Sequence, residues 1–239
     1  MSGRGPNSQS SAVMASRKSG PTSLDFFPTP PWATRALVND ILLPDGLARP
    51  SMKCWEPCCG AGHMAIPLAE TFTVFSSDVH DWGHGDRRDL DFTFSRADDA
   101  PWPVDWVIMN PPFLIAERML DRALSIAQAG VAMFVRLQWL EGGERYRLIF
   151  DGPRRPRLLC PFAERVAIIE HAWDPEASSA TAYAWFVWTS GFNGETTVRH
   201  IGPGAAGRYT RLTDMALASP GEAARRKAAK KKVAGGEAA

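Results

Sequence analysis

The segment Asn110-Pro111-Pro112-Phe113 combines an amide, a constrained backbone and an aromatic ring directly after an apolar run. Two consecutive prolines end a strand and hold the backbone extended. An exocyclic amine on a purine is a weak nucleophile because its lone pair is delocalised into the ring. The Asn110 side-chain oxygen and the Pro111 carbonyl could each accept one amine hydrogen and favour a pyramidal, reactive nitrogen. Phe113 could stack on the base; a rigid strand terminator is the alternative interpretation.

A glycine-rich turn precedes this segment in the chain. Glu56 ends an apolar run, and Gly60 and Gly62 follow it, which allows positive φ and a close approach of backbone to a ligand. The spacing Gly60-x-Gly62-x-x-Ala65 matches a dinucleotide fingerprint, and Asp78 ends the next apolar run, where it could accept from a ribose hydroxyl. The turn alone fits a nicotinamide dinucleotide, S-adenosylmethionine or a plain tight turn.

The elements that must position these residues alternate between strands and helices. Apolar runs rich in β-branched and aromatic residues predict strands at 52–56, 73–78, 106–110 and 131–137. Helical patterns cover 34–42, 63–71 and 115–128. Such alternation predicts an α/β fold with a mostly parallel sheet. Residues 165–169 and 182–188 follow without a helix between them, which predicts an antiparallel strand pair at one edge.

Taken together, the two segments resemble those of S-adenosylmethionine-dependent amino-methyltransferases of the Rossmann-like class I fold. The closer resemblance is to the small adenine-N6 DNA methyltransferases of bacteriophages and prophages, over residues of about 25–200. This resemblance implies an enzyme that binds S-adenosylmethionine, flips its target base from the nucleic acid and transfers the methyl group directly. It implies a catalytic role for Asn110, Pro111, Pro112 and Phe113.

The resemblance also implies a set of cofactor-binding residues. The segment from Asp25 to Thr34 looks like the family's N-terminal cofactor motif, and the glycine turn resembles the family's glycine-rich motif, with Glu56 near the methionine amino group. Asp78 fits the ribose-binding acid, and Asp91 fits the acid at the adenine edge, with Asp89 as the alternative. The full expected set is Phe27, Pro28, Thr29, Pro30, Glu56, Cys58, Gly60, Gly62, Asp78, Asp91 and Asn110.

Two departures from the family pattern concern the substrate. No segment is long enough for the target-recognition domain of larger DNA methyltransferases, and the tetrapeptide ends in Phe, a form that the resemblance implies for RNA and guanine-N2 enzymes too. Nucleic acid is the expected partner, DNA before RNA. An RNA base methyltransferase, acting on adenine N6 or guanine N2, and a non-catalytic nucleic-acid-binding module that kept the pocket remain the alternatives.

Charge and composition divide the chain into three parts. The net charge of +1 is uneven: residues 1–22 carry about +3, residues 222–239 about +4, and the middle is near −6. Residues 1–22 are rich in Ser, Gly and Pro, which predicts a disordered arm. We expect one methyltransferase domain over 23–206 and a basic, flexible tail over 207–239, with a transient helix near 222–233.

The cysteines favour neither a metal site nor a disulfide framework. Cys54, Cys58, Cys59 and Cys160 contain no CxxC pair, and His80 and His84 lack a third ligand, so no metal site is expected. An adjacent cysteine pair favours a reducing compartment. The chain has neither an apolar run of membrane-spanning length nor a signal-peptide pattern, so a cytoplasmic protein is expected.

Overall fold

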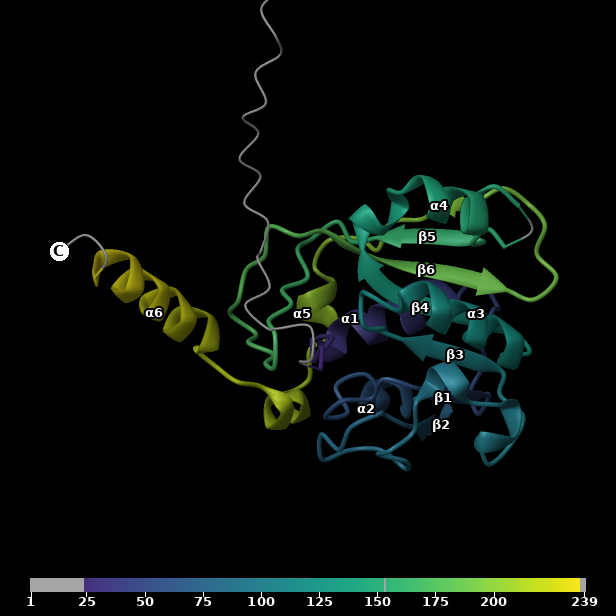
Figure 1. The fold of residues 1–239 in the computed structure, drawn as a ribbon, viewed down its shortest axis with the longest axis horizontal. Coiled ribbons are helices and arrows are strands. Elements are labelled where there is room, and N and C mark those ends of the chain that lie inside the picture. The colour runs from purple at the N-terminus through teal and green to yellow at the C-terminus, as the bar shows by residue number, and fades with distance from the viewer. Residues whose placement is uncertain (1–23, 153, 237–239) are drawn as a thin grey trace, which may run out of the picture.

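The computed structural model describes residues 24–152 and 154–236, so the predicted arm at 1–22 lies outside the described part. A seven-stranded sheet has the order β2-β1-β3-β4-β6-β5-β7 (Figure 1). Strand β6 runs antiparallel to both of its neighbours, and the other pairings are parallel. The strands are β1 Lys53–Glu56, β2 Thr73–Ser76, β3 Trp106–Met109, β4 Gly130–Arg136, β5 Leu158–Pro161, β6 Tyr183–Thr189 and β7 Thr197–Val198.

This sheet confirms the predicted Rossmann-like α/β fold, mostly parallel with an antiparallel strand pair, but one strand of that pair was misplaced. The predicted strand at 165–169 is wrong: this stretch contains only an isolated bridge between Ile169 and Ala172. The partner of β6 is β5, whose Leu158, Leu159 and Cys160 are buried, because the sheet needs apolar side chains on both faces. The two-residue strand β7 continues the sheet beyond this antiparallel pair.

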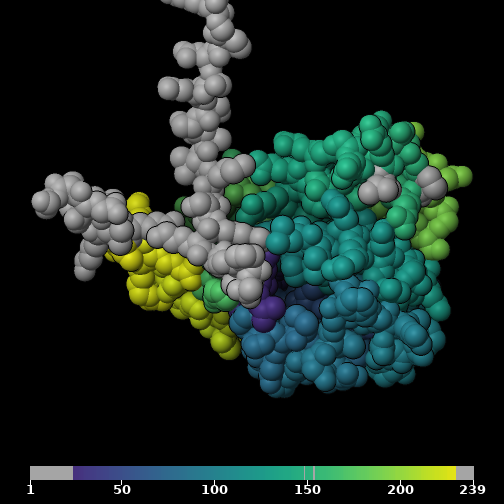
Figure 2. All heavy atoms as spheres, viewed as in Figure 1, coloured from purple at the N-terminus to yellow at the C-terminus, as the bar shows by residue number. Residues whose placement is uncertain are grey.

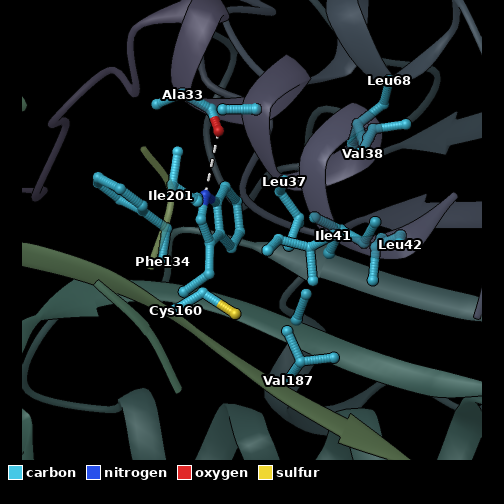
Figure 3. Packing of buried hydrophobic residues seen from close by; sticks show 14 of the residues in the cluster. Ala33, Leu37, Val38, Ile41, Leu42, Leu68, Phe134, Cys160, Val187 and Ile201 are labelled. Atoms are coloured by element: carbon cyan, nitrogen blue, oxygen red, sulfur yellow. Dashed lines mark hydrogen bonds between the residues drawn. The ribbon is translucent and has the colours of Figure 1, made fainter. Parts of the chain in front are cut away.

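Helices cover both faces of the sheet. Helix α1 (Pro31–Ala36) continues as the π-helix η1 (Leu37–Leu42) and packs on one face with α2 (Ala65–Leu68) and α5 (Ala205–Tyr209). On this face the indole of Trp185 donates to the Ala33 carbonyl at 3.1 Å (dashed line, Figure 3). Helix α3 (Ala116–Ile126) and the turns η4 (Leu137–Leu140) and η5 (Tyr146–Phe150) cover the other face.

Alternation along β4 divides its side chains between the two cores. Ala132 and Phe134 face the α1 side, and Val131, Met133 and Val135 face the α3 side, as the two-residue period of a strand requires. The remaining short elements are η2 Phe92–Phe94, η3 Ala97–Asp99 and α4 Gly143–Arg145. No helix within 24–152 and 154–236 is long and apolar enough to cross a membrane.

The chain beyond residue 206, predicted as a tail, contacts the domain through a buried ion pair. Asp214, in the 3₁₀ helix η6 (Leu212–Leu217), accepts from both terminal nitrogens of Arg35 at 2.7 and 2.8 Å. Both side chains are 2% exposed, and Glu70 also accepts from Arg35. Burial alone would lower the pKa of Arg35, but the bonds to Asp214 and Glu70 raise it. The final helix α6 (Glu222–Gly236) projects away from the sheet (Figure 1).

We expect Asp214→Ala to lower the free energy of unfolding by about 3–5 kcal/mol, because Arg35 would stay buried with its charge less well compensated. The control is Arg154→Ala, which breaks an ion pair whose partners Arg154 and Asp121 are about half exposed, and should cost about 0–1 kcal/mol. Denaturant unfolding measures both. Equal decreases in the two variants would contradict a special role for the buried pair.

Candidate functional site

A pocket of about 370 Å³ opens at the carboxyl ends of β1, β2 and β3, where open α/β sheets bind ligands. Figure 2 shows a hollow beside the first described residues, drawn in purple. The volume lies in the range of small-molecule and cofactor sites. Nine of the predicted site residues line the pocket: Phe27, Pro28, Thr29, Glu56, Cys58, Asp78, Asp91, Asn110 and Pro112.

The other predicted residues lie outside this pocket. Pro111 and Phe113 line a small adjoining pocket of about 20 Å³, which shares Asp25, Phe27, Asn110 and Pro112 with the larger one. Pro30 precedes helix α1, and Gly60 and Gly62 form the turn behind the lining residues. The tetrapeptide therefore stands where a large and a small pocket meet.

The glycine turn adopts the positive φ that the sequence predicted, but its crowding comes from the chain itself. Gly60 has φ of 50° and Gly62 has φ of 88°. A Cβ atom at Gly60 would collide with the Phe26 ring, and one at Gly62 would lie 2.8 Å from the His84 ring. Glycine is thus required here by intramolecular packing as well as by backbone conformation.

Asp78 holds the same turn in place. Its Oδ2 accepts from the Gly60 amide at 2.9 Å and its Oδ1 from the His80 amide at 3.1 Å. Burial raises the pKa of Asp78, and these backbone hydrogen bonds act in the opposite direction. Asp78 lines the pocket, so its carboxylate can both brace the turn and face a ligand.

Glu56 is the least satisfied group of the site. Its side chain is 1% exposed, and its Oε2 atom has no hydrogen-bond partner among the described residues. Burial raises the pKa of Glu56 well above its ordinary value, the nearby Asp78 raises it further, and a hydrogen bond from the Ala65 amide partly opposes both. A buried, unpartnered carboxylate oxygen facing a pocket matches a ligand that brings a cationic donor.

An N-terminal strap, residues 24–30, closes one side of the pocket. The Phe26 ring stacks on Trp82 at 4.6 Å and 20°, and the Phe26 carbonyl accepts from the His171 amide at 2.7 Å. These contacts tie the strap to the loop after β2 and to the loop before β6. The strap therefore contributes Phe26 and Phe27 to the pocket from a segment far from the sheet in sequence.

Asn110 joins the strap to the end of β3. Its Nδ2 donates to the Phe27 carbonyl at 2.8 Å and to the Thr29 hydroxyl at 3.0 Å. A backbone carbonyl can only accept, so the amide nitrogen must face the strap, and this determines the position of Oδ1. No residue within 24–152 and 154–236 donates to Oδ1, which leaves it available as an acceptor at the junction of the two pockets.

Phe113 lies between two side chains of its own chain. The Arg136 guanidinium stands 4.4 Å from the ring centroid, and the Phe27 ring lies 5.5 Å away at 46°. A cation over the ring face holds Phe113 in position. The same guanidinium also occupies one position from which a base could stack on Phe113.

The two candidate adenine-edge acids have different surroundings. Asp91 lines the pocket, and its Oδ1 accepts from the amide and the hydroxyl of Thr93 at 2.9 and 2.7 Å. Asp89 does not line the pocket and forms an exposed ion pair with Arg87.

Cys58 lies near Met119, with 3.9 Å between the sulfurs. In the described ranges, no group of three His, Cys, Asp or Glu side chains could hold a metal ion.

Several residues that line the pocket were not among the predicted site residues, and three of them, Phe26, His63 and Trp82, are joined by ring contacts. Phe26 lies within the predicted N-terminal cofactor motif and His63 directly follows the two turn glycines, but no role of its own was predicted for either side chain. Trp82 lies in an irregular loop without periodicity. Only the three-dimensional contact between the strap and this loop brings them together.

No protein-family model matches the chain, and no curated protein matches its sequence. Among solved structures, a predicted O-methyltransferase from Agrobacterium tumefaciens is 16% identical, with TM-score 0.49, covering 80% of this chain and 99% of that one. A Lactococcus lactis protein provisionally named a hemolysin is 11% identical, with TM-score 0.48, and the match covers 69% of this chain and 91% of that one. Magnesium protoporphyrin IX methyltransferase from Synechocystis, solved with bound S-adenosylmethionine, is 15% identical, with TM-score 0.42. The match covers 66% of this chain and 78% of that one. At these values neither activity nor substrate carries over from those proteins.

We expect Glu56→Gln to remove a pH-dependent loss of stability. Because the folded-state pKa of Glu56 is raised, the wild type keeps its proton on folding and loses stability as pH rises from the ordinary glutamate range through the folded value. The loss should be about 1.4 kcal/mol per pH unit in that window. Denaturant unfolding across pH measures it, with Glu195→Gln, 91% exposed, as control. Parallel curves for wild type and Glu56→Gln would contradict the assignment.

Proposed function

We propose that this protein is an S-adenosylmethionine-dependent methyltransferase that acts on an exocyclic amine of a nucleobase, with adenine N6 in DNA as the substrate we favour. The single observation that carries the proposal is the orientation of Asn110. Its amide nitrogen is held by Phe27 and Thr29, so its oxygen is left as an acceptor where the two pockets meet.

The larger pocket fits the cofactor through its donor and acceptor groups. Glu56 brings an unpartnered buried oxygen that suits the methionine ammonium group, and Asp78 and Asp91 bring carboxylates suited to ribose hydroxyls and an adenine amine. The sulfonium group also makes the cofactor cationic, which matches a pocket lined by several carboxylates. When bound, S-adenosylmethionine supplies an electrophilic methyl group.

The smaller pocket supports the second half of the proposal. The Asn110 oxygen and the Pro111 carbonyl can accept the two hydrogens of an amine, which localises its lone pair and stabilises the positive charge that develops on the nitrogen. Both acceptors are preorganised, since two hydrogen bonds hold the Asn110 amide and the prolines restrict the backbone. Phe27 and Phe113 provide apolar walls to this pocket.

The choice of a nucleobase rests on the tetrapeptide, and the choice of DNA rests on the resemblance to phage and prophage enzymes. A base must leave the stack to reach such a site. The test is incubation with S-adenosylmethionine carrying an isotope-labelled methyl group, with DNA, RNA and protein offered separately, followed by mass spectrometry of the nucleosides. Label in N6-methyladenosine from RNA alone would select the RNA alternative. Binding of nucleic acid with no transfer to any substrate would select the non-catalytic module.

Asn110→Ala should lower the rate of methyl transfer about 10²–10³-fold. The reason is that the Asn110 side-chain oxygen stabilises the transition state, in which the target nitrogen is pyramidal, more than it stabilises the bound substrate. Single-turnover transfer with saturating cofactor measures this rate. The matched control is Thr29→Val, which removes one anchor of the amide but keeps the Asn110 oxygen and the Phe27 anchor, so its rate should fall by less than about tenfold. Transfer at the wild-type rate by Asn110→Ala would refute the catalytic assignment.

Removal of residues 222–239 should lower nucleic-acid affinity and flatten its salt dependence. Helix α6 begins with a hydrogen bond from the Ala223 amide to Asp174, and the helix projects away from the sheet (Figure 1). Its sequence is rich in Lys and Arg, whereas the middle of the chain is acidic. The slope of log affinity against log salt should become shallower by about 0.7–0.9 for each phosphate that this segment neutralises. Cofactor affinity serves as the control and should not change. An unchanged slope would show that this segment does not contact nucleic acid.

A further inference from the structure

His63 is a pocket residue whose role neither the sequence nor the proposed reaction assigns. It follows the glycine turn, is 7% exposed and lines the larger pocket. Its ring contacts Phe26 and Trp173 edge to face, with centroids 6.2 and 6.4 Å apart, which fixes the ring plane. One nitrogen of this fixed ring has a protein partner, and the other has none among the described residues.

The partner of His63 determines which nitrogen carries the proton. Nε2 lies 3.0 Å from the carbonyl of Leu217, the last residue of η6. A carbonyl can only accept, so Nε2 bears the hydrogen, and in a neutral imidazole Nδ1 is then a bare acceptor. Burial lowers the pKa of His63 and so favours the neutral ring. Nδ1 is buried and has no hydrogen-bond partner in the described part of the chain.

Two pocket-lining side chains in the described ranges carry a buried acceptor without a partner: His63 with Nδ1 and Glu56 with Oε2. Both side chains line the same pocket, and Glu56 interacts with the backbone amide of Ala65, two residues after His63. A buried pair of acceptors, one of them a carboxylate, matches a ligand group with several donors and a positive charge. In the proposed cofactor, only the α-ammonium group has both properties.

We propose that His63 Nδ1 and Glu56 Oε2 together hold the α-ammonium group of the cofactor's methionine end, and that η6 sets the acceptor state of His63 through Leu217. The inference rests on the proposed function and adds a residue and a chain segment to it. The chain after residue 206 thereby becomes part of the cofactor site: the Arg35–Asp214 pair anchors η6, and η6 places the carbonyl that orients the His63 proton.

The test compares the binding of two ligands, one with the amino-acid end of the cofactor and one without it. S-adenosylhomocysteine carries the ammonium group, whereas 5′-methylthioadenosine has the same nucleoside without the amino-acid end. His63→Phe keeps an aromatic ring between Phe26 and Trp173 but removes both nitrogens. It should weaken S-adenosylhomocysteine binding about tenfold by calorimetry and leave methylthioadenosine binding unchanged, as expected for one charge-assisted hydrogen bond. His80→Phe, on an exposed histidine outside the pocket that contacts Trp82, is the matched control.

An equal decrease in affinity for both ligands, or no decrease for either, would overturn the inference while leaving the proposed function intact. Failure of the wild type to bind S-adenosylhomocysteine would overturn both. Nitrogen-15 NMR of the wild-type histidines gives a second measurement that does not depend on a variant folding. The His63 ring should carry its proton on Nε2, and S-adenosylhomocysteine, but not methylthioadenosine, should shift the Nδ1 signal toward that of a hydrogen-bonded nitrogen. A proton on Nδ1 in the ligand-free protein would contradict the inference.

Discussion

The hydrogen bonds from the Asn110 amide to Phe27 and Thr29 are the interaction on which the site depends. They join an N-terminal strap to the end of β3, and they decide which side of the amide faces the pockets. The prolines that follow stop the strand from extending through this point, so the acceptor stays at the edge of the sheet. The same contact that closes the larger pocket therefore orients the group proposed to act on the target amine.

The buried polar groups of the site that lack a partner lower the stability of the folded protein. Glu56 is buried with an oxygen that no described residue satisfies, and its carboxylate shares a low-dielectric region with Asp78. Protein interiors tolerate such groups where a ligand completes them. His63 Nδ1 follows the same rule, so two unpartnered acceptors mark one end of the pocket. This pattern of unmet hydrogen bonds describes the ligand better than the shape of the pocket does.

The features that could be predicted from the sequence depend on local chemistry. Apolar runs identify β1, β2, β3, β4 and β6, and the glycine turn and tetrapeptide stand at the ends of such runs. The sequence predicted 165–169 as the partner of β6 because no helix separates the two, whereas the actual partner is 158–161, and that pairing depends on contacts across the sheet. The roles of Phe26, His63 and Leu217 depend on contacts between distant segments. No residue type or spacing encodes such contacts.

The buried arginine has a consequence for the order of events during synthesis. Arg35 emerges early from the ribosome, together with the rest of the helix that packs on one face of the sheet, whereas its partner Asp214 emerges 179 residues later. Until then, burying this guanidinium would leave part of its charge uncompensated. The helix can therefore dock fully only after Asp214 has been made, so the N-terminal part of this domain cannot complete its packing by itself.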